Sequence, residues 1–173
     1  MIALVRGGSG SGKSDFAERL AAHLPGTEHV YLATMAASRD EETQRRIARH
    51  RQQRQGRGFR TVEQPRSVRA AGVDKGACVL LECLPNLAAN EMFGGGEPDR
   101  MTWDVLALAD KCAHLVVVTD VICSDGVAYD EGTLKYMALL SSCEACLAQR
   151  ADLVAEVICG IPVALKGEIP CGL

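Results

Sequence analysis

Residues 7–14 read GGSGSGKS, and this octapeptide decides the fold. It follows a short apolar run at 2–5 and leads into a segment in which Phe16, Leu20 and Leu24 recur every four residues. A strand that passes through a glycine-rich turn into a helix points several backbone N–H groups, and the positive end of the helix dipole, at one spot. The pattern G-x-x-x-x-G-K-[ST] in this setting predicts a loop that wraps a polyphosphate.

The residue types of this phosphate loop suit that ligand. Glycines let the backbone approach phosphate oxygens without Cβ clashes. Lys13 is expected to reach the β- and γ-phosphates of ATP or GTP, and the Ser14 hydroxyl is expected to bind a Mg²⁺ that bridges them. A flexible glycine-serine linker is the alternative, but the strand before and the helix after the loop disfavour it. The predicted nucleotide contacts are Gly7, Gly8, Ser9, Gly10, Ser11, Gly12, Lys13 and Ser14.

Length and charge are those of a small globular protein. The 173 residues, of which 47% are hydrophobic, suggest a single nucleotide-binding domain over 1–173. The net charge of −3 gives no general attraction to nucleic acid or to anionic membranes. No stretch approaches the roughly 18 apolar residues that a membrane helix needs. We therefore expect a cytoplasmic protein without nucleic-acid partners or membrane insertion.

Eight cysteines are present, mostly within apolar strand or helix patterns. Such cysteines are typical of small core residues in a reducing compartment. Cys143 and Cys146 form a C-x-x-C, but they lie in a long helical pattern without a second pair at zinc-binding spacing. Core packing is therefore favoured over metal binding at this pair.

Strand and helix patterns alternate along the chain. Apolar or extended runs predict strands at 2–5, 29–34, 59–63, 78–83, 115–119, 154–159 and 161–166. Helical periodicity and capping signals predict helices at 15–24, 38–54, 84–93, 101–112 and 130–151. This alternation predicts an α/β fold: a three-layer P-loop nucleotide-hydrolase (RecA-like) sandwich with a mostly parallel central sheet.

An acidic side chain, Glu82, ends the apolar run of the strand predicted at 78–83. A carboxylate at such a position is costly unless a cation or a hydrogen-bond donor meets it. In this fold an acidic group at the end of a buried strand beside the phosphate loop orients the Mg²⁺ shell. We expect Glu82 to act there with Ser14, directly or through water, and the alternative is a simple strand-end glutamate. An N-K-x-D motif is missing from the sequence, which disfavours a Ras-type GTPase and leaves the nucleotide open.

The helix predicted at 38–54 is unusually basic. Its second half, 45–54, reads RRIARHRQQR, with one large apolar residue and a histidine, His50. Core packing explains such a helix poorly, and guanidinium groups bind phosphate oxygens bidentately. The alternative is a solvated face in which Glu41 and Glu42 pair with arginines one helical turn away. On the residues alone, His50 is either a surface histidine or a nucleophile that attacks phosphorus.

Taken together, these motifs resemble the bifunctional adenosylcobinamide kinase and adenosylcobinamide-phosphate guanylyltransferase family of cobalamin biosynthesis. The resemblance covers nearly the whole chain. It rests on GGSGSGKS at 7–14, YLAT at 31–34, RIARHR at 46–51, RTVE at 60–63, LLEC at 80–83 and AD at 151–152. The R-I-x-x-H-R helix that follows the second strand is the most specific of these motifs.

The resemblance implies two reactions. The terminal phosphate of ATP or GTP passes to the hydroxyl on the aminopropanol arm of adenosylcobinamide, while Lys13 and Mg²⁺ offset charge on the transferred group. His50 then attacks the α-phosphorus of GTP, expels pyrophosphate and holds GMP until the substrate phosphate displaces it, giving adenosylcobinamide-GDP. A homo-oligomer, a trimer in the family, is also implied. Further implied guanine-nucleotide contacts are Ala33, Thr34, Met35, Arg51, Gln52, Gln53, Arg54, Glu63 and Glu82.

One segment departs from the family pattern. Where the family commonly reads T-N-E-V after a buried strand, residues 119–122 read TDVI. The ends of such strands face the ligand crevice, so the change lies where substrate binds. Asp120 either supplies a carboxylate one residue earlier or marks an altered substrate contact.

Two other functions remain open at this stage. One is a P-loop kinase of another small metabolite, in which His50 is incidental. The other is a non-catalytic nucleotide- or RNA-binding module that uses the arginine helix. Three Phe, three Tyr and one Trp provide few stacking surfaces, and the net charge is negative, so RNA binding is disfavoured.

Overall fold

A single seven-stranded sheet forms the centre of the computed structural model, which describes residues 1–35, 58–122 and 127–173. Its strands are β1 (Ile2–Gly7), β2 (His29–Ala33), β3 (Phe59–Glu63), β4 (Cys78–Glu82), β5 (His114–Asp120), β6 (Leu153–Ile158) and β7 (Ile161–Lys166). Their order is β3-β2-β4-β5-β1-β6-β7, and only β6 and β7 pair antiparallel. The mostly parallel α/β sheet predicted from the sequence is confirmed.

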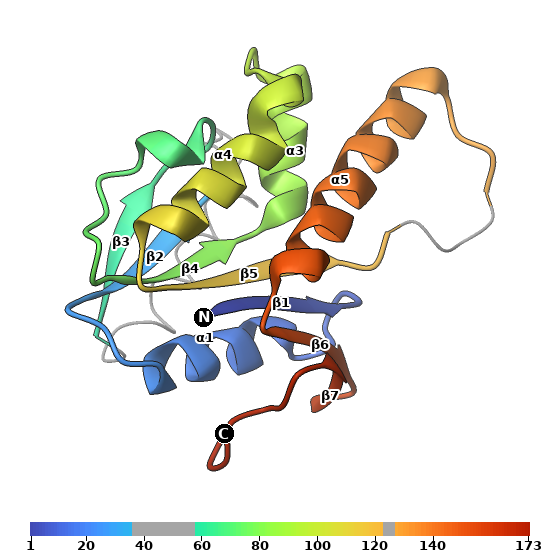
Figure 1. Cartoon of the computed structure of the whole chain (residues 1–173). Coiled ribbons are helices and arrows are strands. Elements are labelled where there is room, and N and C mark those ends of the chain that lie inside the picture. The colour runs from blue at the N-terminus through green and yellow to red at the C-terminus, as the bar shows by residue number, and fades with distance from the viewer. Residues whose placement is uncertain (36–57, 123–126) are drawn as a thin grey trace, which may run out of the picture.

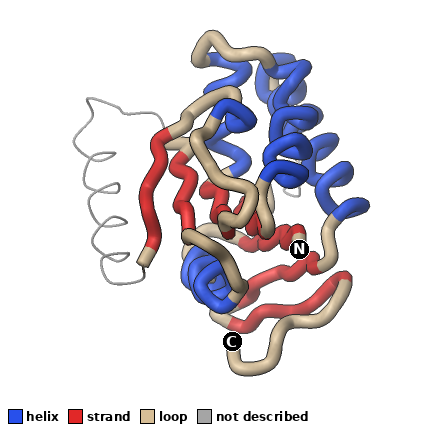
Figure 2. Tube along the Cα trace, turned by 60° about the vertical axis from the view of Figure 1, so that its left-hand side comes forward, coloured by secondary structure: helices blue, strands red, loops and turns tan. Residues whose placement is uncertain are grey.

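Helices cover both faces of the sheet (Figure 1). They are α1 (Lys13–His23), α3 (Leu84–Phe93), α4 (Pro98–Lys111) and α5 (Glu131–Arg150), with a short 3₁₀ helix, η1 (Val68–Ala70). Helix α1 lies on one face, and α3, α4 and α5 lie on the other. Figure 2 shows the strands between these two helical layers. The three-layer arrangement is therefore as expected.

The core explains why the central strands read as continuous apolar runs. In β4, residues 78–81 are fully buried, and successive side chains point to opposite faces. Leu80 belongs to the core under α1, whereas Leu81 belongs to the core under α3, α4 and α5. A strand covered on both faces has no solvent side and therefore no polar alternation.

The helix ends follow local capping chemistry. Pro98 stands at the start of α4, where a missing N–H costs nothing, so this helix begins three residues earlier than predicted. Asp130 caps α5, because its Oδ1 accepts a hydrogen bond of 3.0 Å from the Thr133 N–H. The basic helix predicted at 38–54 lies outside the described residues. None of the described helices combines the length and the apolar character that a membrane span requires.

The described cysteines range from buried to exposed. Cys78 and Cys143 are buried, as the core interpretation predicts. That interpretation is wrong for Cys159 and Cys171, which are exposed; Cys159 stands in the turn between β6 and β7 with φ = 50°. Among the described residues, no three His, Cys, Asp or Glu side chains group as a metal site.

Candidate active site

The phosphate loop joins the end of β1 to the start of α1, and its backbone is shaped by glycine. Gly10 and Gly12 have φ values of 72° and 90°, in the left-handed region that suits glycine. A Cβ on Gly7 would lie 2.5 Å from Ser11 Oγ and 2.8 Å from the Val157 carbonyl oxygen, so this position has no room for a side chain. Among the described residues, no side chain caps the N-terminus of α1, where the capping position is Gly12. The first N–H groups of α1 are therefore oriented to receive an anion.

A turn from the other end of the sequence supports this loop. The Gly160 N–H, between β6 and β7, donates a 2.8 Å hydrogen bond to the Ser11 carbonyl. A Cβ on Gly12 would lie 3.3 Å from Gly160 Cα, so the two backbones are nearly in contact. Gly160 itself has φ = 81°. The loop conformation therefore depends on the β6–β7 hairpin, a contact that the motif does not encode.

Two hydrogen bonds orient the Glu82 carboxylate at the end of β4. Ser14 Oγ donates to Oε1 at 2.7 Å, and the Tyr31 hydroxyl donates to Oε2 at 3.0 Å. Tyr31 lies in β2 and is 4% exposed. Mg²⁺ prefers oxygen ligands, and in nucleotide sites it uses one or two protein groups beside the phosphates. Ser14 and Glu82 together fit such a donor set.

The loop lysine is held by a second carboxylate. Lys13 Nζ lies 2.6 Å from Asp120 Oδ1, and it also donates to the Gly8 carbonyl at 3.1 Å. The Lys13 side chain is 12% exposed and that of Asp120 is 33% exposed. Asp120 ends β5, which lies between β1 and β4, so the segment 119–122 places a carboxylate on the loop lysine.

A polar layer lies on the opposite face of the same strands, under α5. Thr119 Oγ1 donates to Glu144 Oε1 at 2.5 Å, and Thr119 pairs in register with Arg6 of β1. Burial raises the pKa of the Glu144 carboxyl, while the Thr119 hydroxyl and the Arg6 charge partly offset this effect. These contacts fix the end of β5 one residue before Asp120.

Sequence comparison identifies the family to which this site belongs. A family model described as cobinamide kinase / cobinamide phosphate guanyltransferase matches residues 3–165. The chain belongs to this family. The bifunctional adenosylcobalamin biosynthesis protein CobP of Pseudomonas aeruginosa is 33% identical in an alignment of 172 residues that covers 95% of this chain and 97% of that protein.

A second curated relative has the same kind of name. The bifunctional adenosylcobalamin biosynthesis protein CobU of Salmonella typhimurium is 30% identical over 185 residues, covering 96% of this chain and all of that protein (100%). Among solved structures, the flagellar accessory protein FlaH of Methanocaldococcus jannaschii superposes with a TM-score of 0.49 at 10% identity, over 96% of this chain and 78% of that chain. That likeness is too remote to bear on activity.

For this cobinamide kinase / guanyltransferase chain, the structure brings together part of the predicted site. Glu82 lies at the phosphate loop, where it accepts a hydrogen bond from Ser14, the residue after Lys13. Thr34 is fully buried, and its hydroxyl donates to the Cys83 carbonyl at 2.8 Å, so the fold already uses its polar side chain. Ala33, Met35 and Glu63 lie at or just beyond the ends of β2 and β3. The predicted residues that lie outside the described ones are His50, Arg51, Gln52, Gln53 and Arg54.

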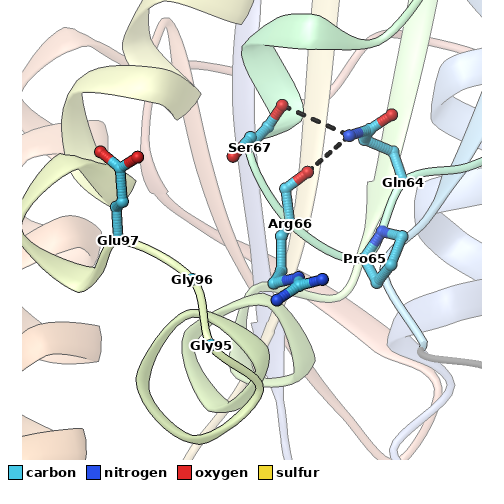
Figure 3. Close-up of a pocket in the computed structure, with 7 residues that line it drawn as sticks. All are labelled: Gln64, Pro65, Arg66, Ser67, Gly95, Gly96 and Glu97. Atoms are coloured by element: carbon cyan, nitrogen blue, oxygen red, sulfur yellow. Dashed lines mark hydrogen bonds between the residues drawn. The ribbon is translucent and has the colours of Figure 1, made fainter.

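A separate cavity of about 350 Å³ lies beyond the end of β3 (Figure 3). Buried Glu91 holds two of its walls together, because its carboxylate accepts from the Ser67 N–H at 2.7 Å and from the Glu97 N–H at 2.8 Å. Gln64 Nε2 donates to the Arg66 carbonyl at 2.6 Å. The lining residues are Gln64, Pro65, Arg66, Ser67, Gly95, Gly96 and Glu97, none of which belongs to the phosphate loop.

Proposed function

We propose that this chain phosphorylates a cobinamide-type corrinoid with ATP or GTP and then transfers GMP from GTP to the product, through a guanylylated His50. The family match over residues 3–165 supports the reaction pair, and both curated relatives are named as bifunctional adenosylcobalamin biosynthesis proteins. The observation that carries the proposal is a phosphate loop in which Lys13 and Ser14 each meet a carboxylate, within that family. Residues 1–173 act in this proposal as one nucleotide-binding domain.

The kinase half rests on the residues around the loop. The uncapped N-terminus of α1 and the loop backbone bind the phosphates, and Lys13 neutralises charge on the terminal phosphate as it is transferred. Ser14 and Glu82 would hold Mg²⁺, which supplies further neutralisation of the phosphate oxygens when bound. Tyr31 keeps the Glu82 carboxylate in one orientation for that role.

The guanylyltransferase half rests on His50 and the basic segment around it, which lie outside the described residues. A neutral imidazole is a competent nucleophile near neutral pH, and it leaves readily from phosphorus once protonated. Among the described residues, the proposed nucleotide contacts are Ala33, Met35 and Glu63, which lie at or just beyond the ends of β2 and β3. Thr34 contributes through its backbone, because its side chain is buried.

In this proposal the enzyme is cytoplasmic. It assembles as a homo-oligomer, which the family resemblance suggests is a trimer. The described surface that supports assembly is the outer strand, β7. Ile161, Val163 and Leu165 alternate along it and are 65%, 44% and 56% exposed. An edge strand with such side chains is a common site of contact between subunits.

Labelling with GTP tests the covalent step. Pure protein is incubated with Mg²⁺ and GTP labelled at the α-phosphate, and we expect a GMP adduct that is labile in acid and stable in alkali, as for a phosphoramidate. His50→Ala should form none, whereas the control His23→Ala, at an exposed histidine in α1, should label like wild type. Lys13→Ala should abolish phosphorylation of adenosylcobinamide. Equal labelling of His50→Ala and wild type would refute the guanylyltransferase mechanism.

A further inference from the structure

Two carboxylates lie at the phosphate loop, on neighbouring strands and on the same face of the sheet. Glu82 ends β4 and Asp120 ends β5. In both strands the residue two positions earlier, Leu80 or Val118, packs in the core under α1. Since side chains alternate along a strand, both carboxylates point toward the α1 side. Glu82 meets Ser14 and Asp120 meets Lys13, so each serves a different group of the loop.

If the site only bound a nucleotide, the negative charge of Asp120 would be unfavourable. The lysine of such a loop contacts the β- and γ-phosphates, so a carboxylate oxygen 2.6 Å from Lys13 Nζ lies beside the terminal phosphate. Two like charges this close together repel each other. Lys13 offsets part of this repulsion. A negative group at this position is better explained by a role in the transfer than by a role in binding.

Among the described residues, two other carboxylates near these strand ends, Glu82 and Glu144, already have hydrogen-bond partners. Both oxygens of Glu82 accept hydrogen bonds, from Ser14 and Tyr31. Glu144 belongs to α5, on the opposite face of the sheet, where it accepts from Thr119. Asp120 is one-third exposed and adjoins the lysine, so a substrate hydroxyl that reaches the terminal phosphate also reaches Asp120.

We propose that Asp120 is the general base of the kinase step, an inference that rests on the proposed function. Asp120 accepts the proton as the O–H bond of the substrate hydroxyl breaks, and the hydroxyl oxygen forms a bond to the γ-phosphorus. The bond from that phosphorus to the β–γ bridging oxygen breaks, and its electron pair leaves with the nucleoside diphosphate. The proton then passes from Asp120 to water. A positioned carboxylate plays this part for hydroxyl substrates of protein kinases.

The second reaction provides an internal control. Its nucleophile is the phosphate group of the phosphorylated corrinoid, which carries no hydroxyl proton that must be removed near neutral pH. A base beside Lys13 therefore matters for phosphorylation and not for guanylyl transfer. A purely structural role at the loop would affect both reactions, since both use the same polyphosphate site in this proposal.

The test compares Asp120→Asn with wild type in two separate assays. One measures phosphorylation of adenosylcobinamide with γ-labelled nucleotide, and the other measures GMP transfer from α-labelled GTP to adenosylcobinamide phosphate. We expect kcat for phosphorylation to fall about 100-fold or more, the usual effect of losing a general base. The KM for nucleotide should stay the same or fall, because Lys13 loses a competing partner. GMP transfer should stay within about threefold of wild type, and Asp110→Asn, at an exposed ion pair with Arg150, should leave both rates unchanged.

Three results would overturn the inference. Phosphorylation by Asp120→Asn within threefold of wild type would show that no base is needed at this position. A parallel loss of both activities, or of the thermal transition, would show that Asp120 only shapes the loop. Wild-type protein that phosphorylates no corrinoid would overturn the proposed function itself, and the inference with it. Partial kinase activity in Asp120→Glu, which keeps a carboxylate, would support the inference further.

Discussion

Glu91 is the buried side chain whose loss should affect stability most clearly. It is 2% exposed and joins the turn before η1 to the N-terminus of α4, through the N–H groups of Ser67 and Glu97. Hydrogen bonds to a charged acceptor contribute about 1.5–3 kcal/mol each. Both donors are only partly buried, so water can replace the carboxylate in part. We therefore use the lower value and expect Glu91→Ala to cost about 3 kcal/mol.

Thermal unfolding measures this loss directly. At roughly 2.1 cal/mol/K per residue, a chain of this length has an unfolding entropy near 0.36 kcal/mol/K, so the melting temperature should fall by about 8 °C. Glu91→Gln keeps one acceptor oxygen and should lose about half as much. Glu97→Ala is the matched control, because it removes an exposed side chain and keeps the backbone N–H. A fall of less than about 2 °C for Glu91→Ala, or an equal fall for Glu97→Ala, would refute the reasoning.

Two further predictions concern the site and the thiols. Tyr31→Phe removes one donor to Glu82 and should lower kcat of the kinase step about tenfold, the equivalent of roughly 1.4 kcal/mol; unchanged initial rates would mean that Ser14 alone positions the carboxylate. Burial raises the pKa of Cys78 and Cys143 to about 12, so the folded state keeps thiol protons that the unfolded state loses near pH 9. Their contribution to stability is present below about pH 9 and is lost as the pH rises toward 12. At pH 8 a thiol reagent should modify exposed Cys159 quickly and the buried pair only on unfolding; equal rates would contradict this.

The local parts of the fold could be predicted because their causes are local. The octapeptide at 7–14 specifies its own turn and the helix after it, and the runs in β4 and β5 lack polar positions because helices cover both faces. Glu82 could be predicted for the same reason, since a carboxylate that ends a buried strand needs a partner. The sequence predicted a mostly parallel sheet but not the order of its strands, because strand pairing depends on contacts between distant segments.

Most of the contacts that sequence reasoning missed join residues far apart in the chain. Tyr31 reads as an ordinary apolar strand residue, and only the pairing of β2 with β4 brings its hydroxyl to Glu82. Glu91 reads as a surface glutamate, yet the chain around η1 and the start of α4 cover it. Thr34 has a further contact of this kind, because its hydroxyl donates to the Cys83 carbonyl just beyond the end of β4.

The position of β1 in the sheet has a consequence for the order in which the site can form. This strand carries the phosphate loop and comes first in the chain, yet its hydrogen-bonded neighbours are β5 and β6, which begin at His114 and Leu153. The turn that supports the loop, at Gly160, comes later still. A ribosome-bound chain that has emerged only as far as α4 therefore has the complete nucleotide-binding motif but no strand to hold it. Nucleotide binding in this protein therefore requires the complete sheet. A nucleotide-binding assay can show when β5, β6 and β7 have been added to it.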